Sequence, residues 1–176
     1  MQARKNFAFL TLLLCFCNTP IAAQVPDSLK SPYRELVKQN NTGNYDNAIA
    51  RGKLLLEQAQ DFPHTYGQLA AAFEKAERIE QGLAYFDSLR QQRPDNPYIH
   101  YALALFEDRK QNSAQAIDYI KKCIEGEPNF LPAYRQLTVT YNSQKEPEKA
   151  AEYFQLLLKN DSLNVAAHYG LGCVYY

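Results

Sequence analysis

A period of 34 residues constrains the fold of this 176-residue chain more than any other feature. When the sequence is shifted by 34 residues against itself, residues of the same kind align again and again. One aligned series is Leu69, Leu103, Leu137 and Leu171, and the residue after each is small: Ala70, Ala104, Thr138 and Gly172. Three further series are Ala48, Gly82, Ala116 and Ala150; Phe86, Ile120 and Phe154; and the rings Tyr66, His100, Tyr134 and His168. A fixed period of this length indicates one structural unit repeated along the chain.

The spacing inside a unit predicts two helices. In the stretch 131–164, one apolar face follows the i, i+3, i+4, i+7 rule of a helix. Its members are Tyr134, Leu137, Thr138 and Tyr141. The polar residues 144–146 then interrupt the pattern, and Pro147 suits the first turn of a second helix, where its missing N–H is not needed. The second apolar stripe is Ala150, Phe154 and Leu157. Two helices of this length cannot bury both stripes alone, so we expect the units to stack.

This order of small and large residues resembles the tetratricopeptide-repeat family. The resemblance implies an all-α solenoid of stacked antiparallel helical hairpins wound into a right-handed superhelix. Ala116 and Ala150 then lie where two helices cross most closely. A large side chain there would overpack the core at a cost of roughly 1–3 kcal/mol.

The repeats divide the chain into segments. We expect a signal peptide at 1–23, a linker at 24–30 and a degenerate first repeat at 31–62, whose first helix around Tyr33 and Leu36 departs from the pattern. Terminal repeats are atypical because they cap the stack. Full repeats follow at 63–96, 97–130 and 131–164, and 165–176 is the first helix of an incomplete repeat. Either the natural protein continues beyond this helix, or a short helix ends it and packs on a partner.

The first residues have the order of a secretory leader. Arg4 and Lys5 are basic, residues 7–17 form a short apolar run, and small residues precede Gln24. The run is shorter than the ~20 apolar residues that span a bilayer, so we expect cleavage near Ala23 rather than a membrane anchor. A lipid anchor is disfavoured because Leu14 and Phe16 precede the two leader cysteines.

Charge and motifs exclude several function classes. Lys+Arg and Asp+Glu both count 19, so removal of the two leader bases leaves 17 basic and 19 acidic residues and a net charge of −2. Nothing therefore predicts binding of nucleic acid or insertion into a membrane after cleavage. No phosphate-binding glycine loop or zinc motif occurs, so we expect no enzyme activity, cofactor, metal or catalytic residue. We expect Cys123 and Cys173 to stay unpaired because a whole hairpin separates them.

In the family, the first helices line a concave groove. The resemblance assigns nine residues of this chain to a peptide-binding groove: His64, Tyr98, Tyr101, Leu105, Arg109, Arg135, Val139, Asn142 and Tyr169. Tyr and Arg are enriched at binding hot spots. The Lys and Asn clamp of chaperone-binding members is absent, since Gly67 and Ala71 stand at its places. We expect Tyr101 and Arg135 to be essential for binding but not for folding. The alternative is that some tyrosines pack against neighbouring helices.

The sequence thus predicts an exported scaffold of bacterial type, periplasmic or secreted, whose groove binds a protein partner as a peptide or a helix. The alternative is the N-terminal sensory or adaptor portion of a longer exported or membrane-linked signalling protein with its effector domain elsewhere.

Overall fold

The computed structural model describes residues 27–176, and all regular structure in this range is helical. The predicted leader lies outside the described residues. The helices are α1 (Asp27–Asn41), α2 (Tyr45–Gln58), α3 (Pro63–Lys75), α4 (Ile79–Gln92), α5 (Pro97–Arg109), α6 (Ser113–Gly126), α7 (Leu131–Ser143), α8 (Pro147–Asn160) and α9 (Val165–Tyr175). The predicted all-α solenoid of helical hairpins is confirmed.

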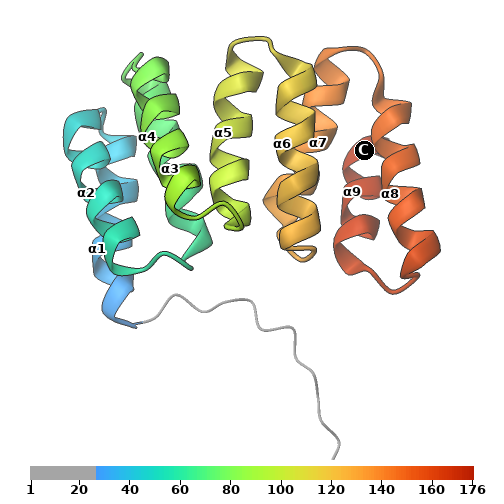
Figure 1. Cartoon of the computed structure of the whole chain (residues 1–176), viewed down its shortest axis with the longest axis horizontal. Helices are drawn as coiled ribbons and strands as arrows, with labels where there is room; N and C mark the ends of the chain where they lie inside the picture. The colour runs from blue at the N-terminus through green and yellow to red at the C-terminus, as the bar shows by residue number, and fades with distance from the viewer. Residues whose placement is uncertain (1–26) are drawn as a thin grey trace, which may run out of the picture.

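The helices follow one another across the molecule from α1 at one end to α9 at the other (Figure 1). Each odd-numbered helix contacts the next odd-numbered helix, whereas no two even-numbered helices within residues 27–176 approach each other as closely. The odd helices therefore form the more tightly spaced layer. In a curved stack the tighter layer lies on the inside of the curve.

The turn inside each hairpin repeats with the same period. Gly43, Glu77, Gln111 and Lys145, spaced by 34 residues, all have positive φ angles, between 59° and 77°. In the second turn the Glu77 N–H donates to the Glu74 carbonyl and the Arg78 N–H to the Phe73 carbonyl, both at 2.9 Å. These two bonds form a Schellman motif, which ends the odd helix and reverses the chain. The polar break seen in the sequence is thus a left-handed turn.

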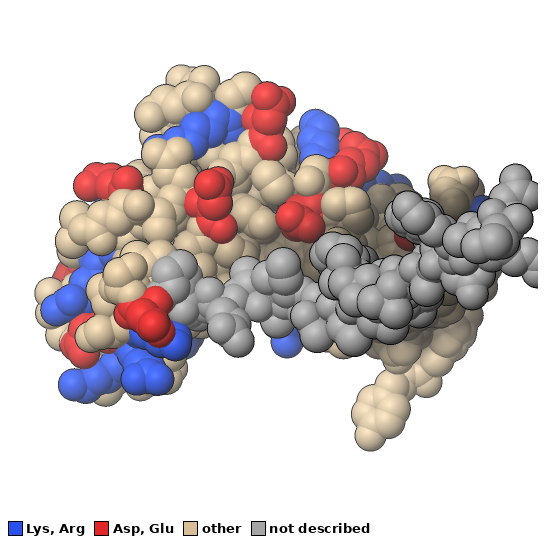
Figure 2. All heavy atoms as spheres, turned by 90° about the horizontal axis from the view of Figure 1, so that it is seen from below, with Lys and Arg blue, Asp and Glu red and all other residues tan. Residues whose placement is uncertain are grey.

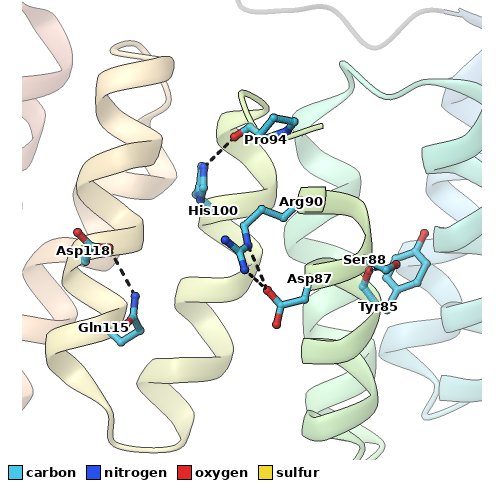
Figure 3. Close-up of polar contacts among 8 residues, drawn as sticks. All are labelled: Tyr85, Asp87, Ser88, Arg90, Pro94, His100, Gln115 and Asp118. Carbon is cyan, nitrogen blue, oxygen red and sulfur yellow. Dashed lines mark hydrogen bonds and ion pairs between the residues drawn. The ribbon is translucent and has the colours of Figure 1, made fainter. Parts of the chain in front are cut away.

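A ring at the fourth position of each odd helix from α3 to α9 ties that helix to the loop before it. The Tyr66 and Tyr134 hydroxyls donate to the carbonyls of Gln60 at 2.7 Å and Pro128 at 2.8 Å. His100 Nε2 lies 3.2 Å from the Pro94 carbonyl oxygen (Figure 3), and His168 Nε2 lies 3.1 Å from that of Ser162. The repeated ring is therefore a loop anchor. His100 is half-buried and its ring stacks on Tyr119, whereas His168 is exposed.

The core consists of two clusters that meet in α5. Ala102 and Leu103 belong to the cluster that extends back to α1, while Tyr101 and Ala104 belong to the cluster that extends forward to α9. Ala116 and Ala150, which were predicted to lie at close helix crossings, are fully buried, and so are Ala48 and Ala104. Helix α5 therefore joins the two core clusters, because it contributes buried residues to both of them.

The N-terminal helix differs from its repeat equivalents. α1 begins at Asp27, inside the segment 24–30 that was predicted as a linker. An ion pair of 2.5 Å joins Asp27 to Lys30 in the first turn, where an acidic side chain also suits the helix dipole. Further along, buried Asn40 donates to the Gln68 backbone carbonyl at 2.9 Å and to its side-chain oxygen at 3.0 Å. A polar contact thus replaces part of the apolar packing between α1 and α3.

Candidate protein-binding face

The candidate site is the exposed side of the odd helices α3, α5, α7 and α9, which we call the inner face. Of the nine residues predicted to lie there, eight are accessible to solvent. Tyr98 and Leu105 are half-buried, and six are exposed: His64, Arg109, Arg135, Val139, Asn142 and Tyr169. Eight of the nine positions that the family resemblance assigned to the groove are therefore accessible to a ligand.

Tyr101 requires a correction. Only 7% of this residue is exposed, and its ring meets Phe130 edge-on with centroids 5.0 Å apart. Gly67 on α3 lies against the same ring, since a Cβ there would sit 3.4 Å from it. Burial raises the pKa of Tyr101, and nearby Arg135 opposes this shift. Tyr101 is a core residue, so its replacement by Ala is expected to destabilise the fold, contrary to the sequence-based expectation.

Arg109 is accessible but already paired. Its guanidinium forms an ion pair with Glu74 of α3, which lies 35 residues earlier. A second polar link joins α5 to α7, where Gln136 Nε2 donates to Asp108 Oδ2 at 3.1 Å. These links between neighbouring odd helices were missed from the sequence, although opposite charges about one period apart were a visible signal. Part of the hydrogen-bonding capacity of the Arg109 guanidinium is therefore already used within the chain.

Tyr98 is also held by its neighbours. Its ring packs edge-on against Phe130 at 5.2 Å, and its hydroxyl donates to Glu127 Oε2 at 3.3 Å. Burial and the adjacent Glu127 carboxylate raise the pKa of Tyr98 to about 12. This tyrosine fastens the loop before α7 to α5, so its hydroxyl is occupied within the chain.

Arg135 differs from Arg109 in having no carboxylate within 4.0 Å among the described residues. It lies exposed on α7, which contacts both α5 and α9. Val139, 48% exposed, lies one helical turn further along α7, and Tyr169 is 40% exposed. A guanidinium bordered by apolar and aromatic surface can hold a carboxylate or a backbone carbonyl while the rings pack on the ligand. We call Leu105, Arg135, Val139 and Tyr169 the Arg135 site.

Other kinds of site have less support. Within residues 27–176, no three His, Cys, Asp or Glu side chains gather as metal ligands would. No helix in that range is both long and apolar enough to cross a bilayer. Basic and acidic side chains both occur on the face seen from below (Figure 2). Cys123 and Cys173 are free thiols, the first of them buried.

Comparisons with known proteins agree with this fold. A family model described as tetratricopeptide repeat matches residues 42–106. A thermophilic tetratricopeptide-repeat protein from Thermus thermophilus has a similar structure, with 20% identity and a TM-score of 0.53 over 75% of this chain and 74% of that one. MamA from Desulfovibrio magneticus is similar at 17% identity and a TM-score of 0.51, over 73% of this chain and 72% of that one. No curated protein has a significantly similar sequence.

The family match spans α2, the hairpin of α3 and α4, and most of α5, and the same turn, ring anchor and small-residue positions recur in the helices that follow it. The described chain therefore has the tetratricopeptide-repeat fold, and its residues 42–106 match the tetratricopeptide-repeat family.

Proposed function

We propose that this protein is a scaffold that binds a protein partner through its inner face, with the Arg135 site as the main contact. The tetratricopeptide-repeat fold supports a role in protein interaction. The observation that carries the proposal is the exposed Arg135 guanidinium, which has no acidic partner among the described residues and lies beside exposed Val139 and Tyr169. The chemistry favours a peptide segment that offers a carboxylate or carbonyl oxygen next to an apolar side chain.

The test replaces Arg135 and Tyr169 together by Ala. Both side chains are exposed, so the melting temperature should change little. Loss of an Arg or aromatic hot-spot residue typically costs about 2 kcal/mol or more, so affinity for a partner captured from the native cell should fall by more than about tenfold. The measurement is the dissociation constant of the identified partner, by calorimetry or fluorescence anisotropy.

Two matched variants make this result specific. Arg109→Ala removes an arginine that is already paired with Glu74 and should weaken binding much less. Tyr101→Ala removes a buried ring and should lower the unfolding free energy by about 3 kcal/mol. If the Arg135/Tyr169 variant is folded and binds the partner with unchanged affinity, the Arg135 site is not the binding surface.

We further propose that the scaffold is exported and acts in the periplasm or outside the cell. The order of basic, apolar and small residues in the first 23 positions supports this location. Expression of the full chain in a bacterium should therefore yield a mature protein that begins near Gln24. N-terminal sequencing checks this, and retention of Met1 or a lipid on Cys17 would contradict it.

A further inference from the structure

Helix α5 carries a titratable ring at a place where α3 and α7 carry tyrosine. Tyr66, His100 and Tyr134 are equivalent in the repeat, and each ring bonds to a carbonyl of the loop before its own helix. In α5 this carbonyl belongs to Pro94, at which the His100 ring is directed (Figure 3). A tyrosine hydroxyl stays neutral up to about pH 10, whereas an imidazole gains a proton near pH 6.5. The α4–α5 loop therefore has an anchor whose charge depends on pH.

The second ring nitrogen of His100 has no acceptor for another proton. Because a carbonyl oxygen only accepts, the Nε2 atom carries the proton of the neutral ring, and Nδ1 is left bare. Nδ1 is buried and has no hydrogen-bond partner among the described residues. A proton there would create a buried donor without an acceptor, which is unfavourable. Burial lowers the pKa of His100, and the bond to Pro94 opposes this shift only in part.

The charged groups that face His100 come from the helices on either side of it. Lys122 of α6 and Arg90 of α4 both lower the pKa of His100, whereas Asp118 of α6 raises it. The aspartates are already paired within their own helices, Asp118 with Lys122 at 2.8 Å and Asp87 with Arg90 at 2.9 Å. No carboxylate is therefore reserved for a protonated His100 among these four residues.

The aromatic neighbour of His100 is also shared with a cation. The His100 ring stacks on Tyr119 of α6, with centroids 5.8 Å apart and planes at 25°. The Lys122 ammonium lies over the same tyrosine ring, 5.8 Å from its centroid. A tyrosine ring attracts one cation, and here a protonated His100 would share it with a second. The stack thus suits the neutral imidazole better than the charged one.

The loop that His100 anchors connects several parts of the stack. Asn96 Oδ1 accepts from two backbone N–H groups in the first turn of α5, at 3.0 and 3.3 Å, and so caps this helix. Asn96 Nδ2 donates to the Tyr66 hydroxyl of α3 at 3.1 Å. Helix α5 in turn contributes buried residues to both core clusters. Movement of the α4–α5 loop therefore affects the junction between the two clusters.

We propose that protonation of His100 in mild acid releases Pro94 and loosens the α4–α5 loop, which makes the junction of the two core clusters sensitive to pH. The direction follows from proton linkage. The pKa of His100 is lower in the folded chain than in the unfolded chain, so the unfolded chain binds the proton first as the pH falls. The stability that neutral His100 contributes is complete above about pH 6.5 and is lost as the pH falls from there through the folded pKa.

Hydrogen exchange of the full chain at about pH 7.5 and about pH 5.5, corrected for the intrinsic pH dependence of exchange, tests this inference. The amides of Arg93 and Asn96 are hydrogen-bonded at the α4–α5 loop and should lose protection several-fold in acid. The equivalent amides of Glu127 and Phe130 are an internal control, because Tyr134 anchors their loop. They should keep their protection. Equal responses of the two loops to acid would overturn the proposal, and this comparison needs only the native chain.

Three variants assign the response to one ring. His100→Tyr installs the anchor that α3 and α7 already use, so the chain should fold and the α4–α5 loop should no longer respond to acid. His100→Gln is neutral at both pH values and should also remove the response. His64→Gln removes an exposed histidine of α3 and should retain the native response. Persistence of the acid response in either folded His100 variant, or its loss in His64→Gln, would refute the role of His100.

Discussion

At the scale of single residues, glycines show how closely the helices cross. A Cβ on Gly82 of α4 would collide with the ring of buried Phe106 on α5. A Cβ on Gly170 of α9 would lie 2.8 Å from the Phe154 ring on α8, whereas a Cβ on Gly172 would meet nothing within 4 Å. Two glycines in one helix thus have different roles, because only one faces a neighbouring aromatic ring.

A first prediction compares Gly82, which faces the Phe106 ring, with Gly172, which has open space beside it. Alanine is favoured over glycine inside a helix by about 1 kcal/mol, yet overpacking a core costs roughly 1–3 kcal/mol. Gly82→Ala should therefore lower the unfolding free energy by about 1 kcal/mol, while Gly172→Ala should raise it by about 0.5 kcal/mol. Urea unfolding followed by circular dichroism measures both. Stabilisation by Gly82→Ala would show that Phe106 can move aside without cost.

At the scale of elements, the left-handed turn decides how each hairpin closes. The turn has glycine only in the first hairpin, at Gly43, while Glu77, Gln111 and Lys145 adopt the same positive φ. A residue with a Cβ is strained in this conformation by roughly 1–2 kcal/mol. The backbone hydrogen bonds of the Schellman motif hold all three residues there, as the 2.8 Å bond from the Asn112 N–H to the Glu107 carbonyl illustrates.

This strain predicts opposite changes in the unfolding free energy for two substitutions. Gly43→Ala should reduce the unfolding free energy by about 1 kcal/mol, because alanine resists the left-handed conformation. Gln111→Gly should increase it by about 0.5 kcal/mol, since part of the relief is offset by the greater freedom of glycine in the unfolded chain. The shift in denaturation midpoint tests both. Destabilisation by Gln111→Gly would mean that its side chain contributes more than its backbone strain costs.

At the scale of the whole molecule, stability should vary along the stack. α5 contributes to both core clusters, and it has its most extensive contact with α6, where Ala104 and Ala116 are fully buried. α9 instead exposes Val165 and Tyr175 at 74% and 72%. In repeat arrays, each unit draws its stability from its neighbours, so ends open more easily than the middle.

Hydrogen exchange followed by mass spectrometry measures this gradient. Amides of α5 and α6 should exchange slowest, and those of α9 should be the first in the C-terminal half to exchange. The physical reason is that opening α5 disrupts both clusters, whereas opening α9 uncovers α7 and α8 in one cluster only. Equal protection of α5 and α9 would show that the described chain unfolds as a single cooperative unit.

The sequence by itself determined the period, the alternation of helices and turns, and the positions of the small residues. A repeated pattern of apolar residues is local information, and helix periodicity converts it directly into buried and exposed faces. The family and the hairpin architecture followed from this pattern. The left-handed turn did not, because Glu77, Gln111 and Lys145 give no sign of the conformation that Gly43 adopts readily.

Only the tertiary structure decided which predicted site residues are free. Gly67, Tyr101, Arg135 and Tyr169 share one repeat place, and nothing local distinguishes the two tyrosines. Tyr101 is buried because Gly67 leaves space beside its ring and Phe130 covers it, while Tyr169 stays exposed. Likewise, Arg109 is neutralised by Glu74 on the neighbouring helix. A repeat place sets the direction of a side chain, but its exposure depends on the size and charge of residues about 34 positions away.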